Sequence, residues 1–167
     1  MLLLISGLPG SGKSTVARAY VARHGGIHIN SDLMRNEMNL RGHYDPADKA
    51  RVYAAMLART RAVLEQGGNA VVDSTFYRQS IREPFEQVAR ELGIPVFRVE
   101  VKAREETIRR RLQKSRPDSE ADFAVYEKIR DRYERCPEPL LTLWTDELPP
   151  ELLAKTIHRY ITAQNDP

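Results

Sequence analysis

Eight residues near the start of the chain have the types and spacing of a phosphate-binding loop. Residues 7–14 read Gly-Leu-Pro-Gly-Ser-Gly-Lys-Ser and fit the Walker A pattern G-x-x-x-x-G-K-[ST] at every fixed position. Glycines let the backbone bring successive N–H groups close to an anion, and a following helix N-terminus adds donors and partial positive charge. Lys13 can then reach the β- and γ-phosphates, and the Ser14 hydroxyl can ligate Mg²⁺. We therefore predict that ATP with Mg²⁺ is bound by Gly7, Leu8, Pro9, Gly10, Ser11, Gly12, Lys13, Ser14 and Thr15.

The residues on either side of this loop support the same interpretation. Residues 2–5 are a short apolar run, which is typical of a buried parallel strand, and residues 15–22 have a helical pattern. Strand, glycine-rich loop and helix are the context that the motif requires. The alternative, a glycine-rich turn that only joins a strand to a helix, does not explain why every fixed position is filled.

Two aspartates follow later strand patterns, where ligands gather in open parallel sheets. Asp32 lies just beyond a strand predicted at 27–29, and Asp73 ends a strand predicted at 70–72. If a helix begins near Ser31, Asp32 and Arg35 lie on one helical face. Asp32 is then a candidate general base for an acceptor hydroxyl, and Arg35 a candidate anchor for an acidic group of the acceptor. The alternative is that Asp32 only stabilises the helix N-terminus.

Asp73 is the second candidate metal ligand, beside Ser14. A carboxylate at this strand end can hold Mg²⁺ through water. The alternative is an aspartate that terminates the strand and accepts hydrogen bonds from loop amides.

A phosphoryl-transfer enzyme also needs cations on the transferring group. The helix predicted at 105–114 and the turn after it are rich in basic residues, most of which we expect to face solvent. Arg111 and Arg116 are the candidates for contact with the phosphates, because they lie late in the helix and near the turn at Pro117.

Helical and strand patterns alternate along the 167 residues. This alternation predicts an α/β fold of the P-loop NTPase class: three α/β/α layers, a mainly parallel sheet of about five strands and a helical lid. We expect one kinase domain over residues 1–167, with the lid at about 104–135. In detail, we expect Asp45 and Pro46 to open one helix, and Ser80 or Pro84 to open the next. A later helix should carry Phe123, Tyr126 and Tyr133, and a last strand should bury Trp144.

The amino-acid composition limits which kinds of protein the chain can be. Hydrophobic residues make up 41% and charged residues 29%, with a net charge of +3, which suits a globular protein. The basic balance permits a nucleic-acid partner without requiring one. Neither a signal peptide nor a membrane-spanning run is recognisable, and Cys136 is the single cysteine. We expect a cytoplasmic location, an inert thiol, no membrane partner and no stable protein partner.

Other P-loop classes lack their markers here. The sequence has no guanine-reading N-K-x-D run, no D-x-x-G switch after the third strand, and no L-S-G-G-Q run. A small kinase with an arginine-bearing lid fits best. A non-catalytic ATP-binding regulator and an ATPase subunit of a ring remain open alternatives.

The set GLPGSGKST, NSDLMR, VVDST, RRRLQKSR and SEADFAVYEKI resembles the P-loop kinases related to polynucleotide 5′-kinase and the zeta-type toxin kinases. The resemblance extends from Met1 to about Tyr133. It implies an ATP- and Mg²⁺-dependent kinase in which Asp32 is the general base and Arg35 contacts an acceptor phosphate. It also implies that Arg111 or Arg116 contacts the ATP phosphates. The leading acceptor is the 5′-hydroxyl of a nucleic acid, followed by a small molecule such as a nucleoside, sugar or antibiotic.

Overall fold

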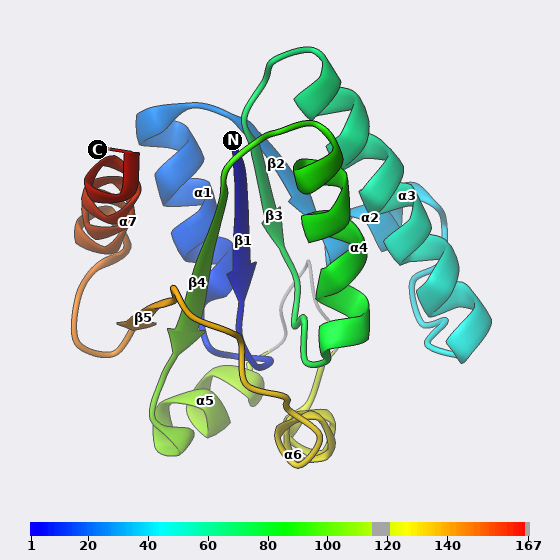
Figure 1. Ribbon diagram of the computed structural model, residues 1–167. Coiled ribbons are helices and arrows are strands. Elements are labelled where there is room, and N and C mark those ends of the chain that lie inside the picture. Colours follow the sequence, from blue (N-terminus) through cyan, green and yellow to red (C-terminus); the bar gives the residue numbers. More distant parts are fainter. Residues whose placement is uncertain (115–120, 166–167) are drawn as a thin grey trace.

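A five-stranded parallel sheet forms the centre of the structure (Figure 1), a computed structural model that describes residues 1–114 and 121–165. The strands occur in the spatial order β2-β3-β1-β4-β5. Because all neighbouring strands are parallel, their carboxyl ends meet at one edge of the sheet, the lower edge in Figure 1. Their bounds are β1 (Leu2–Ser6), β2 (Ile27–Asn30), β3 (Ala70–Asp73), β4 (Val96–Lys102) and β5 (Leu141–Trp144).

Four long helices cover the two faces of this sheet. The helices α1 (Lys13–His24) and α7 (Pro150–Asn165) pack on one face, and α3 (Pro46–Glu65) and α4 (Gln79–Glu91) on the other. Every residue of β1 is buried, because alternate side chains enter opposite cores. Leu2 and Leu4 pack with α3 and α4, whereas Leu3 and Ile5 pack with α1 and α7. The predicted three-layer α/β/α fold is confirmed.

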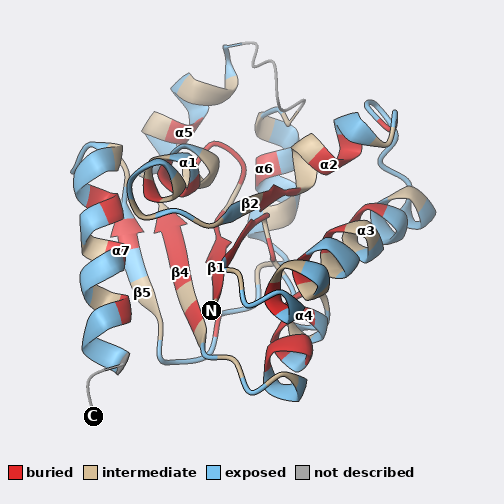
Figure 2. Ribbon diagram, turned by 90° about the horizontal axis from the view of Figure 1, so that it is seen from above, coloured by how far each residue is buried: buried red, intermediate tan, exposed pale blue. Residues whose placement is uncertain are grey.

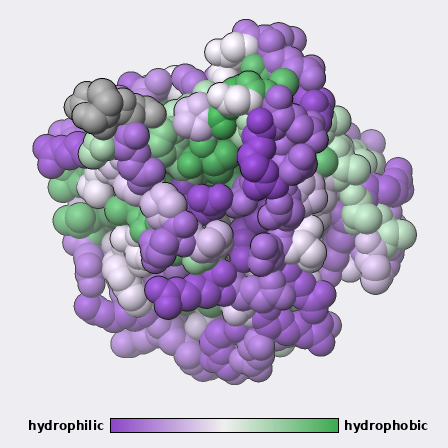
Figure 3. Space-filling view, in the orientation of Figure 1, coloured by the Kyte–Doolittle hydropathy of each residue, from purple (hydrophilic) through white to green (hydrophobic). Residues whose placement is uncertain are grey.

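Three short helices lie at the carboxyl edge. They are α2 (Ser31–Glu37), which follows β2 directly, α5 (Glu105–Leu112) and α6 (Phe123–Arg130). Figure 2 shows red, buried strands in the middle of the molecule and mostly exposed or intermediate residues on α5 and α6. The lower half of the face in Figure 3, which includes the region of α5 and α6, is mainly hydrophilic. Within the described ranges, no helix is long and apolar enough to cross a membrane.

Local capping determines where two of the helices begin. Asp45 accepts a hydrogen bond from the backbone N–H of Asp48 (2.9 Å), and Pro46 is the first residue of α3, as predicted. Asp122 caps α6 in the same way by accepting from the N–H of Val125 (2.9 Å).

The start of α4 differs from the prediction. The helix begins at Gln79 rather than at Ser80 or Pro84, and Pro84 lies inside it. A distant residue replaces the expected side-chain cap, because a carboxylate oxygen of Glu134 accepts from the backbone N–H of Gln79 (2.7 Å). This contact joins residues 55 positions apart, so no local pattern could reveal it.

Two aromatic residues also differ from the prediction. Trp144 is 39% exposed rather than part of the core, because β5 is an edge strand and its alternate side chains face outward. Tyr133 lies beyond α6, which ends at Arg130. Cys136 is buried, and this burial raises the pKa of its thiol, which agrees with an inert cysteine.

Candidate active site

The phosphate-binding loop joins β1 to α1 at the carboxyl edge of the sheet, and Lys13 is the first residue of α1. Its glycines are needed for two different reasons. Gly12 has a φ of 95°, a left-handed conformation that other residues rarely adopt. At Gly7 the limit is space, since a Cβ atom would lie 2.5 Å from the backbone oxygen of Val101. The turn is closed by the N–H of Ser11, which donates to the oxygen of Leu8 (3.1 Å).

Ser14 and Asp73 meet at the carboxyl ends of the strands. The Ser14 hydroxyl donates to Oδ1 of Asp73 over 3.0 Å, and Asp73 is completely buried. The two metal-binding candidates of the sequence are therefore neighbours. Hydroxyl and carboxylate oxygens are ligands that suit Mg²⁺, which commonly uses one or two carboxylates, the substrate phosphates and water.

Two residues that sequence reasoning missed complete this cluster. Asn30 donates through Nδ2 to Oδ1 of Asp73 (2.6 Å) and to the hydroxyl of Ser14 (3.2 Å). Nε2 of His28 hydrogen bonds to the other carboxylate oxygen of Asp73. The signal was present, because His28 and Asn30 are polar residues at alternate positions of β2, and β2 pairs with β3 so that Asn30 lies opposite Asp73.

Asn30 also determines where α2 begins. Its Oδ1 accepts from the backbone N–H of Leu33 (2.8 Å), so the side chain caps α2 while its nitrogen binds Asp73. The predicted helix start near Ser31 is confirmed, and Asp32 lies in the first turn with Arg35 three residues later. The roles of Asp32 and Arg35 stay predictions.

Arg35 is almost completely buried, with 6% of its surface exposed. Its Nη1 donates to the backbone oxygen of His43, and its guanidinium lies 4.4 Å from the centroid of the Tyr44 ring. Its Nε is buried without a hydrogen-bond partner. The loop between α2 and α3 therefore holds this cation beside Asp32.

Arg111 has a different environment from the one expected of a lid cation. It donates through Nη1 to the backbone oxygens of Gly10 (3.1 Å) and Ser11 (3.2 Å) and to Oγ1 of Thr145 (2.8 Å). Its Nη2 donates to the backbone oxygen of Thr145 (3.2 Å). Burial lowers the pKa of Arg111, although nearby Asp146 acts in the opposite direction. Arg111 thus binds two backbone oxygens of the phosphate-binding loop. Arg116 lies outside the described residues.

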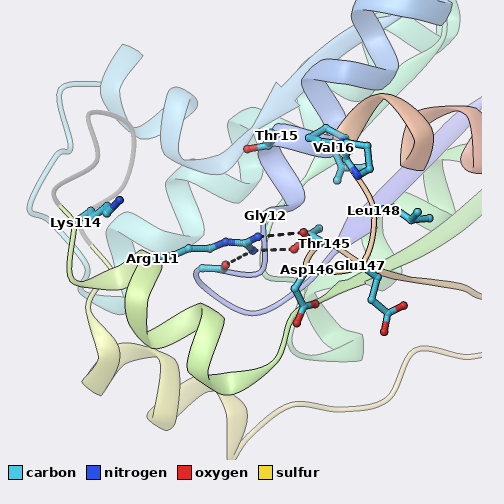
Figure 4. Close-up of a pocket in the computed structure, with 12 residues that line it drawn as sticks. Gly12, Thr15, Val16, Arg111, Lys114, Thr145, Asp146, Glu147 and Leu148 are labelled. Carbon is cyan, nitrogen blue, oxygen red and sulfur yellow. Dashed lines mark hydrogen bonds between the residues drawn. The ribbon is translucent and has the colours of Figure 1, made fainter.

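Thr145, which follows β5, is a further residue that the sequence did not indicate. Its hydroxyl donates to the backbone oxygen of Ser11 (2.6 Å) and receives the Arg111 bond. Figure 4 shows Arg111 reaching from α5 toward Gly12 and Thr145. Thr145 is 134 residues from Ser11 in the sequence, so only the folded chain reveals the pair.

A pocket of about 690 Å³ lies beside the loop (Figure 4), within the range of small-molecule sites. Loop residues, the end of α5 and the segment after β5 contribute to its wall. The lining residues are Gly10, Gly12, Thr15, Val16, Arg111, Lys114, Thr145, Asp146, Glu147, Leu148, Pro149 and Pro150. Its size and its position next to the loop suit the nucleoside part of a nucleotide.

Residues 2–136 match the model of the AAA_33 family, described as an AAA domain. The chain belongs to this family. Three solved structures share its fold over nearly their whole length. Kti12 of Chaetomium thermophilum, in complex with ADP-AlF3, is 23% identical, with a TM-score of 0.76 and 98% of each chain covered.

The second structure is the APS kinase of Mycobacterium tuberculosis in complex with AMPPNP and APS, at 21% identity, a TM-score of 0.71 and 96% of each chain. The third is a gluconokinase of Sinorhizobium meliloti, at 17% identity and a TM-score of 0.72, covering 98% of this chain and 94% of the other. The comparison with curated proteins gave no match. The fold of this AAA_33 member is therefore a P-loop fold that known kinases share.

Proposed function

We propose that the protein is an ATP-dependent kinase that transfers the γ-phosphoryl group to a hydroxyl acceptor. The observation that carries the proposal is the hydrogen bond between Ser14 of the phosphate-binding loop and buried Asp73 of β3 (3.0 Å). It supports a metal-binding pair directly beside a nucleotide loop, with the carboxylate of Asp32 on the adjacent helix. The fold shared with kinases supports the same reaction class.

The residues present fit Mg²⁺. In the part of the chain that the structure describes, no group of three or more His, Cys, Asp or Glu could hold a metal. Ser14 and Asp73 would instead supply two oxygen ligands, and the nucleotide and water the others. When bound, the ion would neutralise charge on the phosphates. Asn30 and His28 would keep the carboxylate of Asp73 oriented.

In the proposed reaction, the acceptor oxygen forms a bond to the γ-phosphorus and the bond to the β–γ bridging oxygen breaks, which releases ADP. The hydroxyl proton passes to the carboxylate of Asp32. Lys13 and a lid arginine, Arg116 or Arg111, would stabilise the charge on the transferred group. Because Arg111 donates hydrogen bonds to the loop, its proposed role is mainly to hold the conformation of the loop.

For the acceptor, the resemblance to polynucleotide 5′-kinases and zeta-type toxin kinases supports the 5′-hydroxyl of a nucleic acid, with Arg35 near its phosphate. A small-molecule acceptor is the second candidate, supported by the fold shared with an APS kinase and a gluconokinase. The proposal places this activity in one domain, with the lid at about 104–135, in the cytoplasm, where Cys136 stays reduced.

The test is transfer of label from γ-labelled ATP with Mg²⁺ to a panel of acceptors. The panel contains 5′-hydroxyl DNA and RNA oligonucleotides, nucleosides, sugars and aminoglycosides. Asp32→Asn should remove transfer and leave ATP affinity nearly unchanged, and Glu37→Gln, on the exposed part of the same helix, should retain transfer. ATP binding without label on any acceptor would contradict the kinase proposal.

A further inference from the structure

Three hydroxyl groups from separate elements form a continuous hydrogen-bonded chain at the carboxyl edge of the sheet. The Oη of Tyr53, on α3, lies 2.8 Å from the Oγ of Ser74, which directly follows β3. The Oγ of Ser74 donates in turn to the Oγ of Ser31, the first residue of α2, over 3.2 Å. The hydroxyl chain therefore joins α3 to the end of β3 and to the residue immediately before Asp32.

The protons of this hydroxyl chain run in one direction. A hydroxyl group has a single proton, and Ser74 gives its proton to Ser31, so Tyr53 is the donor to Ser74. Burial raises the pKa of Tyr53, and the charge of Asp32 acts in the same direction, so the phenol keeps its proton at neutral pH. Because Ser74 is only 1% exposed, water hardly competes for these hydrogen bonds.

The turn after β3 has a strained conformation that keeps Ser74 in the hydroxyl chain. Phe76 is completely buried and has a φ of 46°, a left-handed conformation that a phenylalanine rarely adopts. The ring of Tyr53 packs near the Phe76 ring, with centroids 6.3 Å apart, and Arg82 of α4 donates to the backbone oxygen of Phe76. The N–H of Ser74 donates to the backbone oxygen of Ile5 in β1 (3.3 Å). Contacts from three elements therefore hold this turn against its own strain.

The hydroxyl chain ends on the helical turn that carries the candidate base. The Oδ1 of Asn30 accepts from the N–H of Leu33 (2.8 Å), which fixes the start of α2 to β2. The bond from Ser74 to Ser31 is a second attachment, and it fixes the same turn to the end of β3. With seven residues, α2 is too short to be stable by itself. Contacts with neighbouring elements therefore set the position of Asp32.

We propose that Tyr53 is a positioning residue for Asp32 and acts through Ser74 and Ser31. The hydroxyl chain holds the first turn of α2 against the end of β3, so that the carboxylate of Asp32 stays within reach of the acceptor hydroxyl. A small displacement of the base costs rate rather than nucleotide affinity, because proton transfer requires hydrogen-bond distance. The role in catalysis rests on the proposed kinase function, whereas the attachment of α2 stands on the hydrogen bonds themselves.

Variants that remove one hydroxyl test the proposal by transfer of label from γ-labelled ATP. Tyr53→Phe retains the ring beside Phe76, and Ser31→Ala removes the last group of the hydroxyl chain. Each variant should lower kcat about ten-fold and leave the Kd of ATP unchanged. The double variant should lose little more than either single variant, since both interrupt one hydroxyl chain. Ser31→Thr, which keeps the hydroxyl, should retain most of the rate.

Tyr160→Phe is the matched control. It removes a buried phenol hydroxyl on α7 that has no hydrogen-bond partner within the described residues, so it should transfer label at the wild-type rate. Equal losses in Tyr160→Phe and Tyr53→Phe would overturn the positioning role. A parallel fall in ATP affinity, or additive losses in the double variant, would overturn it as well.

Amide hydrogen exchange without nucleotide separates the attachment of α2 from the kinase function. The amides of α2 should exchange about ten-fold faster in Tyr53→Phe than in the wild type, while those of α7 are unchanged. If no acceptor is labelled but exchange is faster, the attachment is supported, and the kinase function fails together with the role in catalysis. Label transfer by Tyr53→Phe at the wild-type rate would overturn the proposal and leave the kinase function intact.

Discussion

The proposed nucleotide side of the sheet edge, around the phosphate-binding loop, and the proposed acceptor side, around Arg35 on α2, are held by different contacts. On the nucleotide side, polar groups are bonded to one another: Ser14 reaches buried Asp73, and Arg111 makes four hydrogen bonds to the loop and to Thr145. On the side of α2, buried Arg35 donates to the backbone oxygen of His43, but its Nε has no hydrogen-bond partner within the described residues. The polar groups of the nucleotide side are thus bonded to one another without a ligand, whereas on the other side a buried cation keeps one N–H without a partner.

The largest effect should come from the nucleotide side. Lys13→Ala removes the cation of the phosphate-binding loop and should lower transfer or release of label from γ-labelled ATP by about 10²- to 10³-fold. Thermal unfolding should confirm that the variant is folded, and Lys155→Ala is the matched control. A variant rate close to that of the wild type would show that the loop lysine does not contribute to transfer.

Asn30 belongs to both sides, since it caps α2 and binds Asp73. Asn30→Asp preserves the cap but places a second carboxylate beside Asp73, so the free energy of unfolding should fall by about 1–3 kcal/mol without metal. Mg²⁺ with ATP should restore part of the loss, because the cation offsets the repulsion. The measurement is urea unfolding with and without Mg²⁺-ATP, and a loss that these ligands leave unchanged would contradict the metal site.

Arg111→Lys tests whether the loop is organised in advance. A lysine cannot reproduce the bonds to Gly10, Ser11 and Thr145 together, so we expect a loss of about 1–2 kcal/mol in unfolding free energy and weaker ATP binding. Arg110→Lys, at an exposed neighbouring position, should change neither. Unfolding in denaturant and ATP titration measure the two effects. Identical results for both variants would argue that the hydrogen bonds of Arg111 do not organise the loop.

The smallest expected effect concerns the contact between α1 and α7, which lies outside the candidate site. The rings of His24 on α1 and His158 on α7 are stacked with centroids 4.1 Å apart. The pKa of His24 is lowered in the folded state, first by burial and then by the charges of His158 and Arg23. The folded state therefore binds fewer protons than the unfolded state, and stability should decline as pH falls below about 6.5, the usual pKa of histidine.

Urea unfolding between pH 8 and pH 5 measures this decline. His24→Gln should show a shallower dependence on pH than the wild type, since the titrating group is removed. Equal slopes in the two proteins would assign the pH dependence to other groups.

The fold could be predicted because its signals are local. The apolar run of residues 2–5, a loop with glycines at fixed positions and the capping pair Asp45 and Pro46 each act within a few residues. The start of α4 could not be predicted, because its first N–H is satisfied by Glu134. The exposure of Trp144 also depended on strand order, which places β5 at the edge of the sheet.

The candidate site also has features that the sequence predicts and features that depend on the tertiary structure. Residue type and spacing alone determined the phosphate-binding loop, the pair Asp32 and Arg35 and the strand-end position of Asp73, because backbone conformation and helical periodicity depend on near neighbours. Only the tertiary structure placed His28 and Asn30 against Asp73, and the hydroxyl of Thr145 against the backbone oxygen of Ser11. These contacts join residues that are distant in the chain, and they exist only because parallel strands bring their carboxyl ends to one edge and the packed helices fix what lies beyond it.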